Sequence, residues 1–156
     1  MIGCWRANAA AGMLVLVAAC DGASDSGDDN GDDVVPACIE YTLDGCAQLY
    51  PPTYDQVWAQ TLTNGCAEFG TACHAQSDAA GAKNGLTFTD PQQSHDHLLM
   101  SGERGPLVVP GDPLCSPLFV RLATDDASIR MPPGGSSLAP GALCSIATWI
   151  ADGAAP

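Results

Sequence analysis

Cysteine constrains this chain more than any other residue, because eight occur among its 156 residues. A reducing cytosol keeps cysteines as thiols and an exported protein pairs them, so the count favours an oxidising compartment. The chain also has 17 Gly and 12 Pro, which predicts a loop-rich fold with a modest core. An even number lie in residues 36–156, as an exported domain should have: Cys38, Cys46, Cys66, Cys73, Cys115 and Cys144.

The charge balance excludes several classes of partner. Eighteen Asp and Glu stand against five Lys and Arg, giving a formal net charge of −13. Nucleic-acid phosphates and anionic lipid headgroups both attract basic residues, so we expect neither as a partner. The sequence has no apolar run of the 18 or so residues that a membrane span needs. It also lacks a Ser-His-Asp order, a phosphate loop and a catalytic carboxylate pair, so hydrolase chemistry is not indicated.

The first residues have the features of an export signal. A short basic start is followed by an uncharged apolar run, and residues 1–19 are predicted to be a signal peptide. Its end, Val17-Ala18-Ala19-Cys20, resembles a bacterial lipobox, which implies a mature chain that begins at acylated Cys20. Cys4 would leave with the signal. The alternative is ordinary secretory cleavage with Cys20 unmodified. We expect a periplasm-facing, lipid-anchored protein on either the inner or the outer membrane.

Residues 20–35 are predicted to form an acidic flexible tether. Six Asp fall between Asp21 and Asp33, with only Ala23 apolar among them, so little can offset the entropy of ordering. A calcium site is the alternative, with Asp28, Asp32 and Asp33 as oxygen ligands. The spacing lacks the alternating ligands and terminal Glu of an EF-hand loop.

Residues 36–156 are predicted to form one all-α domain of four short helices. Thr53 and Gln56 form a capping-box pattern, and Asn64-Gly65 would end that first helix. The later helices have proline at their starts. Those starts are Asp90-Pro91, Ser116-Pro117 and Pro140, and the last helix would close at Gly153. The residues expected to be buried are Tyr54, Val57, Trp58, Leu62, Leu98, Leu99, Leu118, Phe119, Leu122, Leu143, Ile146, Trp149 and Ile150.

One cysteine pair is followed directly by histidine. The stretch from Cys66 to Cys73-His74 resembles a c-type haem attachment site, in which two thiols bond to the haem vinyls and the adjacent His binds iron. Six residues separate these cysteines, whereas the usual motif has two. The alternative is a Cys66–Cys73 disulfide beside an ordinary His. A zinc site would need a fourth ligand that is missing at the usual spacing.

Further motifs follow in a familiar order along the chain. They are Leu107-Val-Val-Pro-Gly-Asp-Pro113, Ser116-Pro117-Leu118, Met131-Pro132-Pro133-Gly134-Gly135 and Trp149-Ile-Ala-Asp-Gly-Ala154. Together they resemble the planctomycete-type cytochrome c domain, over roughly residues 50–154. The resemblance implies a cytochrome c fold in which the first and last helices cross. It also implies covalent haem c on Cys66 and Cys73, with His74 as the proximal and Met131 as the distal iron ligand.

The resemblance therefore implies an electron carrier rather than an enzyme. A lipid-anchored monohaem cytochrome would pass single electrons to an envelope redox partner, and the acidic surface favours a partner with a basic docking face. The resemblance, with Cys66 and Cys73 set aside, pairs Cys115 with Cys144 and Cys38 with Cys46. The alternative function is a haem-free, disulfide-stapled domain of the same fold that acts as a structural or binding lipoprotein.

The remaining candidate ligands have plainer interpretations. Met131 is either a haem ligand or a core residue before a turn. Met100 follows Leu98 and Leu99 at a helix end, and we expect it to pack. His95 and His97 lie two residues apart, so on a helix they face different directions and we expect them to be solvent-exposed rather than joint metal ligands.

Overall fold

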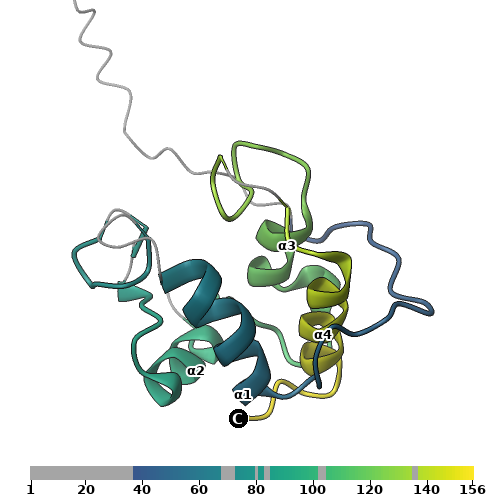
Figure 1. The fold of residues 1–156 in the computed structure, drawn as a ribbon, viewed down its shortest axis with the longest axis horizontal. Coiled ribbons are helices and arrows are strands. Elements are labelled where there is room, and N and C mark those ends of the chain that lie inside the picture. The colour runs from purple at the N-terminus through teal and green to yellow at the C-terminus, as the bar shows by residue number, and fades with distance from the viewer. Residues whose placement is uncertain (1–36, 68–72, 80, 83–84, 102–104, 135–136) are drawn as a thin grey trace, which may run out of the picture. The chain divides into compact units, whose positions relative to one another are not determined.

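The structure is a computed structural model, and it describes residues 37–67, 73–79, 81–82, 85–101, 105–134 and 137–156 (Figure 1). The described residues contain helices and no strand, which confirms the all-α prediction. None of the helices in these ranges is long and apolar enough to cross a membrane. The predicted signal peptide, Cys20 and the whole of the predicted tether lie outside the described residues.

The first helical segment begins where predicted but lacks the predicted cap and extends past its predicted end. Helix α1 (Tyr54–Val57) begins where expected, but the Thr53 side chain makes no capping hydrogen bond. The chain then continues without a break as the π-helix η1 (Trp58–Ala67), past the expected stop at Asn64-Gly65. The Asn64 amide is instead used within the helix, since it donates to the Ala59 carbonyl at 2.7 Å. This extension carries Cys66 on the last turn of η1.

Three further helices begin at the predicted prolines. They are α2 (Pro91–Leu99), α3 (Pro117–Ala123) and α4 (Pro140–Ala151), and a short 3-10 helix, η4 (Pro113–Cys115), precedes α3. Proline suits the first turn because the N–H that it lacks would have no helical partner there. The Asp90 carboxylate caps α2 by accepting from the Gln93 N–H at 2.7 Å. Gly153, at φ +100°, follows α4 in the left-handed conformation that a helix end often requires.

The core lies where α4 meets α1, α3 and η4. Tyr54 of α1 packs against Trp149 of α4 with ring centroids 5.5 Å apart, so the first and last helices are in contact (Figure 1). Most predicted core residues are buried, with Trp58, Leu99 and Leu118 partly so. The fully buried side chains come from several elements: Val57, Leu62, Leu98, Val108, Phe119, Val120, Ile146 and Ile150.

Two residues of the α2 region reverse their expected burial. His95 is 5% exposed, because its Nε2–H donates to the Ala154 carbonyl at 2.8 Å and its ring packs on Tyr54 at 4.7 Å. The prediction of an exposed His95 was therefore wrong. Met100 is 59% exposed, so the prediction that it packs was wrong too. It follows the last residue of α2, where the backbone has turned to an extended conformation.

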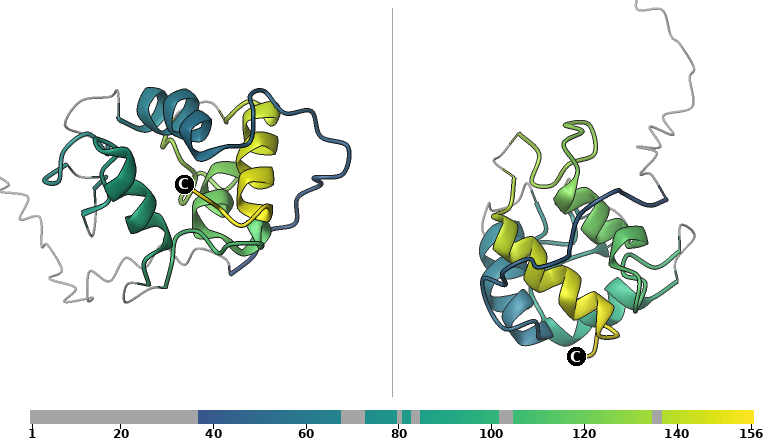
Figure 2. Two further views of the ribbon diagram at one scale, coloured as in Figure 1. Left: turned by 90° about the horizontal axis from the view of Figure 1, so that it is seen from below. Right: turned by 90° about the vertical axis from the view of Figure 1, so that its right-hand side faces the viewer.

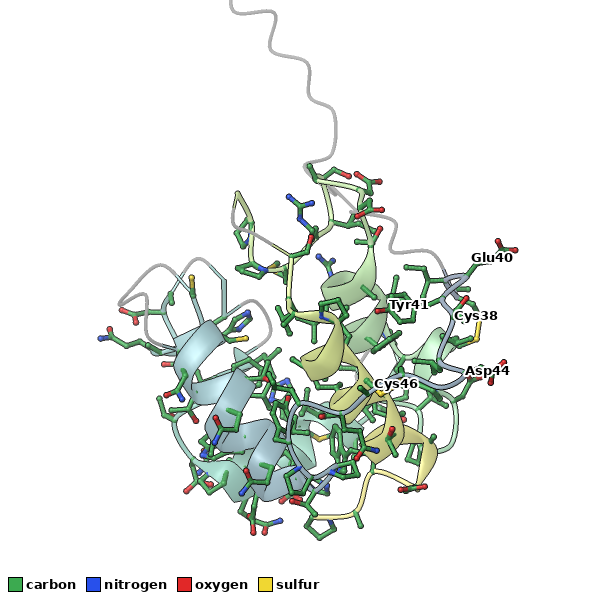
Figure 3. All side chains as sticks on the ribbon, turned by 45° about the vertical axis from the view of Figure 1, so that its right-hand side comes forward. Cys38, Glu40, Tyr41, Asp44 and Cys46 are labelled. Carbon is green, nitrogen blue, oxygen red and sulfur yellow. A yellow bond between two sulfur atoms is a disulfide. The ribbon has the colours of Figure 1, made fainter. Side chains whose placement is uncertain are left out.

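Residues 38–50 form a strap that runs past α3 and α4 (Figure 2). Tyr41 of the strap meets Phe119 edge-on at 5.4 Å, while Glu40 and Asp44 are exposed (Figure 3). Two disulfides fasten it, Cys38–Cys115 and Cys46–Cys144.

The expected disulfide partners were therefore wrong, although the same four cysteines form bonds. The strap is extended, so each of its cysteines lies beside a different helix rather than beside the other. Ile39 N–H donates to the Leu114 carbonyl at 2.9 Å, which brings Cys38 to η4. Leu49 N–H donates to the Gly141 carbonyl at 2.9 Å, which brings the other end of the strap to α4.

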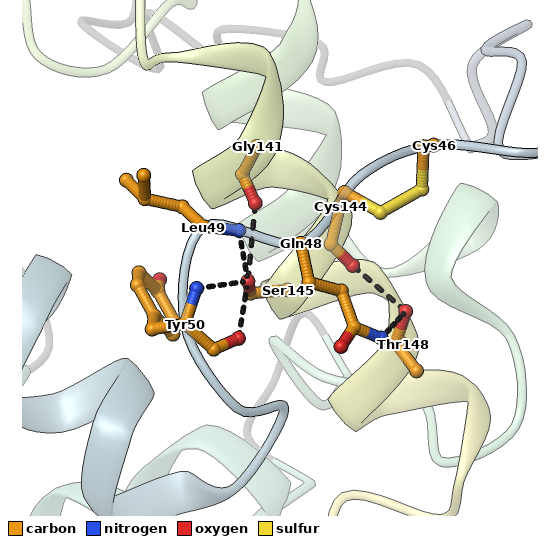
Figure 4. The surroundings of a disulfide bond; sticks show 8 residues. All are labelled: Cys46, Gln48, Leu49, Tyr50, Gly141, Cys144, Ser145 and Thr148. Carbon is orange, nitrogen blue, oxygen red and sulfur yellow. Dashed lines mark hydrogen bonds between the residues drawn. A yellow bond between two sulfur atoms is a disulfide. The ribbon is translucent and has the colours of Figure 1, made fainter.

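Ser145 joins the strap to α4 at its buried end (Figure 4). Its hydroxyl oxygen accepts from the Leu49 and Tyr50 N–H groups at 3.1 and 3.2 Å and lies 2.7 Å from the Tyr50 carbonyl. Gly141 lets the strap approach α4 closely, because a Cβ there would lie 3.1 Å from the Ala47 carbonyl oxygen. This end of the strap is held by a disulfide, hydrogen bonds and close backbone contact.

Candidate functional site

A small hollow on the domain brings together the four residues that the sequence singles out. Its volume is about 60 Å³. Residues from two parts of the chain that are distant in sequence line it: Gly65, Cys66, Cys73, His74, Gly81, Met131, Pro132 and Pro133. The structure thus brings both thiols, the imidazole and the thioether to one place.

His74 is held by the segment that follows it. Its Nδ1 lies 3.0 Å from the Leu86 carbonyl oxygen, and its own carbonyl accepts from Phe88 N–H at 2.8 Å. A carbonyl can only accept, so Nδ1 must carry the hydrogen. The lone pair of the neutral ring is then on Nε2, which is the arrangement that metal-binding histidines use. Phe88 packs beside the ring with centroids 5.1 Å apart.

The two cysteines of the hollow are free thiols. Cys66 is on η1, and its carbonyl accepts from His74 N–H at 3.2 Å, which brings the residue next to Cys73 against the end of η1. Burial, and in second place the charge of Cys73, raise the pKa of the Cys66 thiol to about 11. At neutral pH Cys66 is therefore a protonated, weakly nucleophilic thiol.

Met131 is positioned by the end of α3. Its N–H donates to the Arg121 carbonyl at 2.8 Å, and the Arg121 guanidinium donates to the Ile129 carbonyl at 3.1 Å. Ile129 is 4% exposed and fastens this loop to the domain. Met131 itself is partly buried and packs against the core. The interpretation of Met131 as a packing residue is therefore supported, alongside its place in the hollow. Pro132 and Pro133 follow it along the rim of the hollow.

The donor set fits a c-type haem in its chemistry. Two free thiols suit thioether bonds to the vinyls, and an imidazole with Nε2 available and a thioether suit the two axial positions. At about 60 Å³ the hollow is smaller than a haem, so the residues that line it would have to move apart to hold one. Over the described ranges, no three His, Cys, Asp or Glu side chains are grouped to hold a metal ion, which leaves the zinc alternative without support.

Two residues of the site escaped the sequence analysis. Gly81 lines the hollow, and a Cβ there would lie 3.0 Å from the Cys73 carbonyl oxygen, so only glycine fits without a shift. Leu86 contributes through its carbonyl, which any residue could supply. The sequence contains no signal for a backbone contact of this kind. The only available cue was the glycine and alanine content of residues 79–85.

Comparison with known families gives one finding that bears on the site. Residues 71–135 match the family model described as planctomycete cytochrome C. The matched segment includes Cys73, His74 and Met131, and it begins after Cys66. Comparisons with curated proteins and with solved structures found no match. The similarity of this chain to the planctomycete cytochrome C family is therefore confirmed, on the segment that runs from Cys73-His74 to the Met131 loop.

Proposed function

We propose that the domain binds one haem c covalently and carries single electrons in the cell envelope. Cys66 and Cys73 would hold the haem through thioether bonds, with His74 as the proximal and Met131 as the distal ligand. The observation that carries this proposal is that these four side chains, from segments far apart in sequence, line one hollow. The family match over Cys73, His74 and Met131 supports it independently.

Each residue of the site has a distinct task in this proposal. The Leu86 carbonyl fixes the tautomer and the direction of the His74 ring before any iron is bound. The Arg121 carbonyl holds the Met131 backbone at the end of α3, so that its flexible thioether is restricted to one region. When bound, haem iron supplies the one-electron redox chemistry, and a Met ligand raises its potential relative to a second His. The chain itself supplies all four of the bonds that would hold the haem and its iron.

The partner and the anchor are part of the same proposal. A lipid chain on Cys20 would hold the mature protein at a membrane, with residues 20–35 as the spacer. The net charge of −13 supports a redox partner with a basic docking face, with an association rate that falls as salt rises. Exposed carboxylates in the described part of the domain include Glu40, Asp44, Asp90 and Asp126.

Paired ligand variants test the proposal in the chain co-expressed with cytochrome c maturation proteins. The wild type should give an alkaline pyridine haemochrome spectrum and, when oxidised, the weak far-red band of a Met–iron bond. Met131→Ala should lose that band and keep its haem, because the thioethers still hold it. Met100→Ala is the matched control, since Met100 is exposed on the surface, and it should keep both. A wild-type chain that stays colourless would refute the proposal.

A haem-free domain is the second candidate function, and the size of the hollow favours it. The volume of about 60 Å³ is closed to a haem without movement of its walls. In that case the domain would be a structural or binding lipoprotein. A folded, colourless chain with Cys66 bonded to Cys73 is the result that would establish this candidate.

A further inference from the structure

We propose that the hollow binds one Cu(I) ion in the chain that carries no haem. The ligands are the thiolates of Cys66 and Cys73 and the thioether of Met131, three residues that all line the hollow. Thioether bonds to haem would use up both thiols, so the copper-bound and haem-bound forms exclude each other. The inference does not depend on the proposed function, because it needs only the donor atoms of the hollow.

The state of the cysteines is the first support. Cys38, Cys46, Cys115 and Cys144 are all in disulfides, whereas Cys66 and Cys73 both have free sulfurs and both line the hollow. The hydrogen bond from His74 N–H to the Cys66 carbonyl brings the residue next to Cys73 against the backbone of Cys66. Both free thiols therefore belong to one hollow rather than to separate parts of the domain.

The kind of donor selects the metal. Thiolate and thioether sulfur are soft ligands and favour Cu(I), whereas Ca²⁺ and Mg²⁺ require oxygen ligands, and the lining contains no carboxylate. Zinc requires a set of four nitrogen, sulfur or oxygen ligands. Within the described residues, His, Cys, Asp and Glu form no such group even at three ligands. Methionine is not one of these four residue types. Its thioether is a ligand that Cu(I) accepts and that zinc does not favour, so Met131 adds a donor for copper only.

Size and surroundings suit a single ion. A space of about 60 Å³ is adequate for an ion among sulfur atoms. The rest of the lining is Gly65, Gly81, Pro132 and Pro133, which offers no charged side chain. The formal charge of −13 attracts cations to the protein as a whole.

The binding step involves no change of oxidation state. Cu⁺ and two thiols give a bis-thiolate complex and two released protons, with copper remaining Cu(I) and Met131 adding a neutral sulfur donor. Affinity must therefore rise with pH, as it does for any metal that displaces thiol protons.

The test uses the full-length chain expressed without haem-attachment proteins and kept anaerobic. Alkylation and intact mass first establish that Cys66 and Cys73 are free and that both strap disulfides are intact. Cu(I) is then titrated in competition with a chromogenic Cu(I) chelator. The expected result is about one Cu(I) per chain retained against the chelator, with sulfur scattering in its X-ray absorption spectrum.

Matched variants show whether the hollow is the site. Cys66→Ser and Cys73→Ser should each weaken Cu(I) binding at least about tenfold. Met131→Leu, which keeps size and polarity, should weaken it severalfold, while Met100→Leu should leave it unchanged. Circular dichroism verifies that each variant is folded.

Three results would overturn the inference. One is a chain with both thiols free that loses all copper to the chelator. Another is equal loss of affinity in Met131→Leu and Met100→Leu. The third is a Cys66–Cys73 disulfide that persists under every condition in which the strap disulfides survive. A haemochrome spectrum measured on the co-expressed chain is a separate readout, so failure of the copper inference and failure of the haem proposal are distinguishable.

Discussion

The strap side and the hollow side of the domain are held together in different ways. On the strap side, two disulfides, the Ser145 hydroxyl and the close approach at Gly141 fasten residues 38–50 to η4 and α4. On the hollow side, the contacts described are hydrogen bonds and ring packing around two free thiols, such as the bonds from His74 to Leu86 and from Met131 to Arg121.

The two sides of the domain therefore differ in what their cysteines can do. A cysteine already in a disulfide cannot bind a vinyl group or a metal, so the strap cysteines are committed to structure. The hollow can open only if its walls are not cross-linked, and admitting haem requires them to separate. We infer that the strap side supplies the stability that the hollow side, which must stay adaptable, cannot.

Among the changes predicted here, removing the Cys46–Cys144 disulfide should have the largest effect on stability. The Cys46–Cys144 bond joins residues 98 apart in sequence, so its loss in the double variant Cys46→Ser/Cys144→Ser should lower the free energy of unfolding by about 4 kcal/mol. The double variant Cys66→Ser/Cys73→Ser is the control in the haem-free chain, and it should change stability by about 1 kcal/mol or less. Urea denaturation measures both. Equal losses would remove the distinction between the two sides.

Removing the Ser145 hydroxyl should have the second largest effect on the free energy of unfolding. Ser145 is 0% exposed, and Ser145→Ala leaves the N–H of the buried Tyr50 without this acceptor, while Leu49 N–H keeps the Gly141 carbonyl. An unsatisfied buried group costs about 1–3 kcal/mol, so we expect a loss of about 2 kcal/mol in unfolding free energy. The exposed Ser128, which bonds Asp126, is the control, and Ser128→Ala should cost about 0.5 kcal/mol or less. A similar loss in both variants would contradict the role given to Ser145.

Two helical glycines compare the sides directly. A Cβ on Gly141 would lie 3.1 Å from strap backbone that a disulfide prevents from moving, so Gly141→Ala should destabilise by about 1 kcal/mol. A Cβ on Gly65 would meet nothing within 4 Å, so Gly65→Ala should stabilise by up to about 1 kcal/mol, as alanine does in a helix. Thermal unfolding measures whether each variant is stabilised or destabilised. If Gly141→Ala were stabilising, as Gly65→Ala is expected to be, the strap backbone would have to move away from the added Cβ, which would contradict the account.

The thiol of Cys66 offers the smallest effect, a shift in pH dependence. Its folded pKa of about 11 exceeds the usual thiol value of about 8.5, because burial disfavours the thiolate. Alkylation of Cys66 by iodoacetamide should therefore be slow at pH 8 and rise up to about pH 11, whereas in urea it should level off near pH 9. The folded state prefers the protonated thiol, so this contribution to stability is present below about pH 8.5 and is lost as pH rises toward 11. Peptide mapping after timed alkylation measures the rate at which Cys66 reacts at each pH. Identical pH profiles in buffer and in urea would contradict the raised pKa of this thiol.

The sequence was sufficient to predict where the four α-helices begin. Pro91, Pro117 and Pro140 mark true helix starts, since proline restricts the backbone locally and needs no distant partner. The end of the first helix was missed because Asn64-Gly65, a local stop signal, is overridden by the packing of η1.

Contacts between distant segments were harder to predict. The disulfide partners depend on the path of the strap, which carries no periodic pattern. His95 is buried by contacts with Tyr54, Trp149 and Ala154, all of which are distant in sequence. Met131 and His74 were found because methionine and histidine are chemically distinctive ligands. Gly81 and the Leu86 carbonyl were not, because they contribute through the backbone.

The most direct test of the account is a non-reducing peptide map of the chain produced with cytochrome c maturation proteins. The account predicts haem mass on the peptide that contains Cys66, Cys73 and His74, together with intact Cys38–Cys115 and Cys46–Cys144 disulfides. A colourless chain in which Cys66 is bonded to Cys73 would contradict it, because the hollow side would then be cross-linked like the strap side and closed to haem.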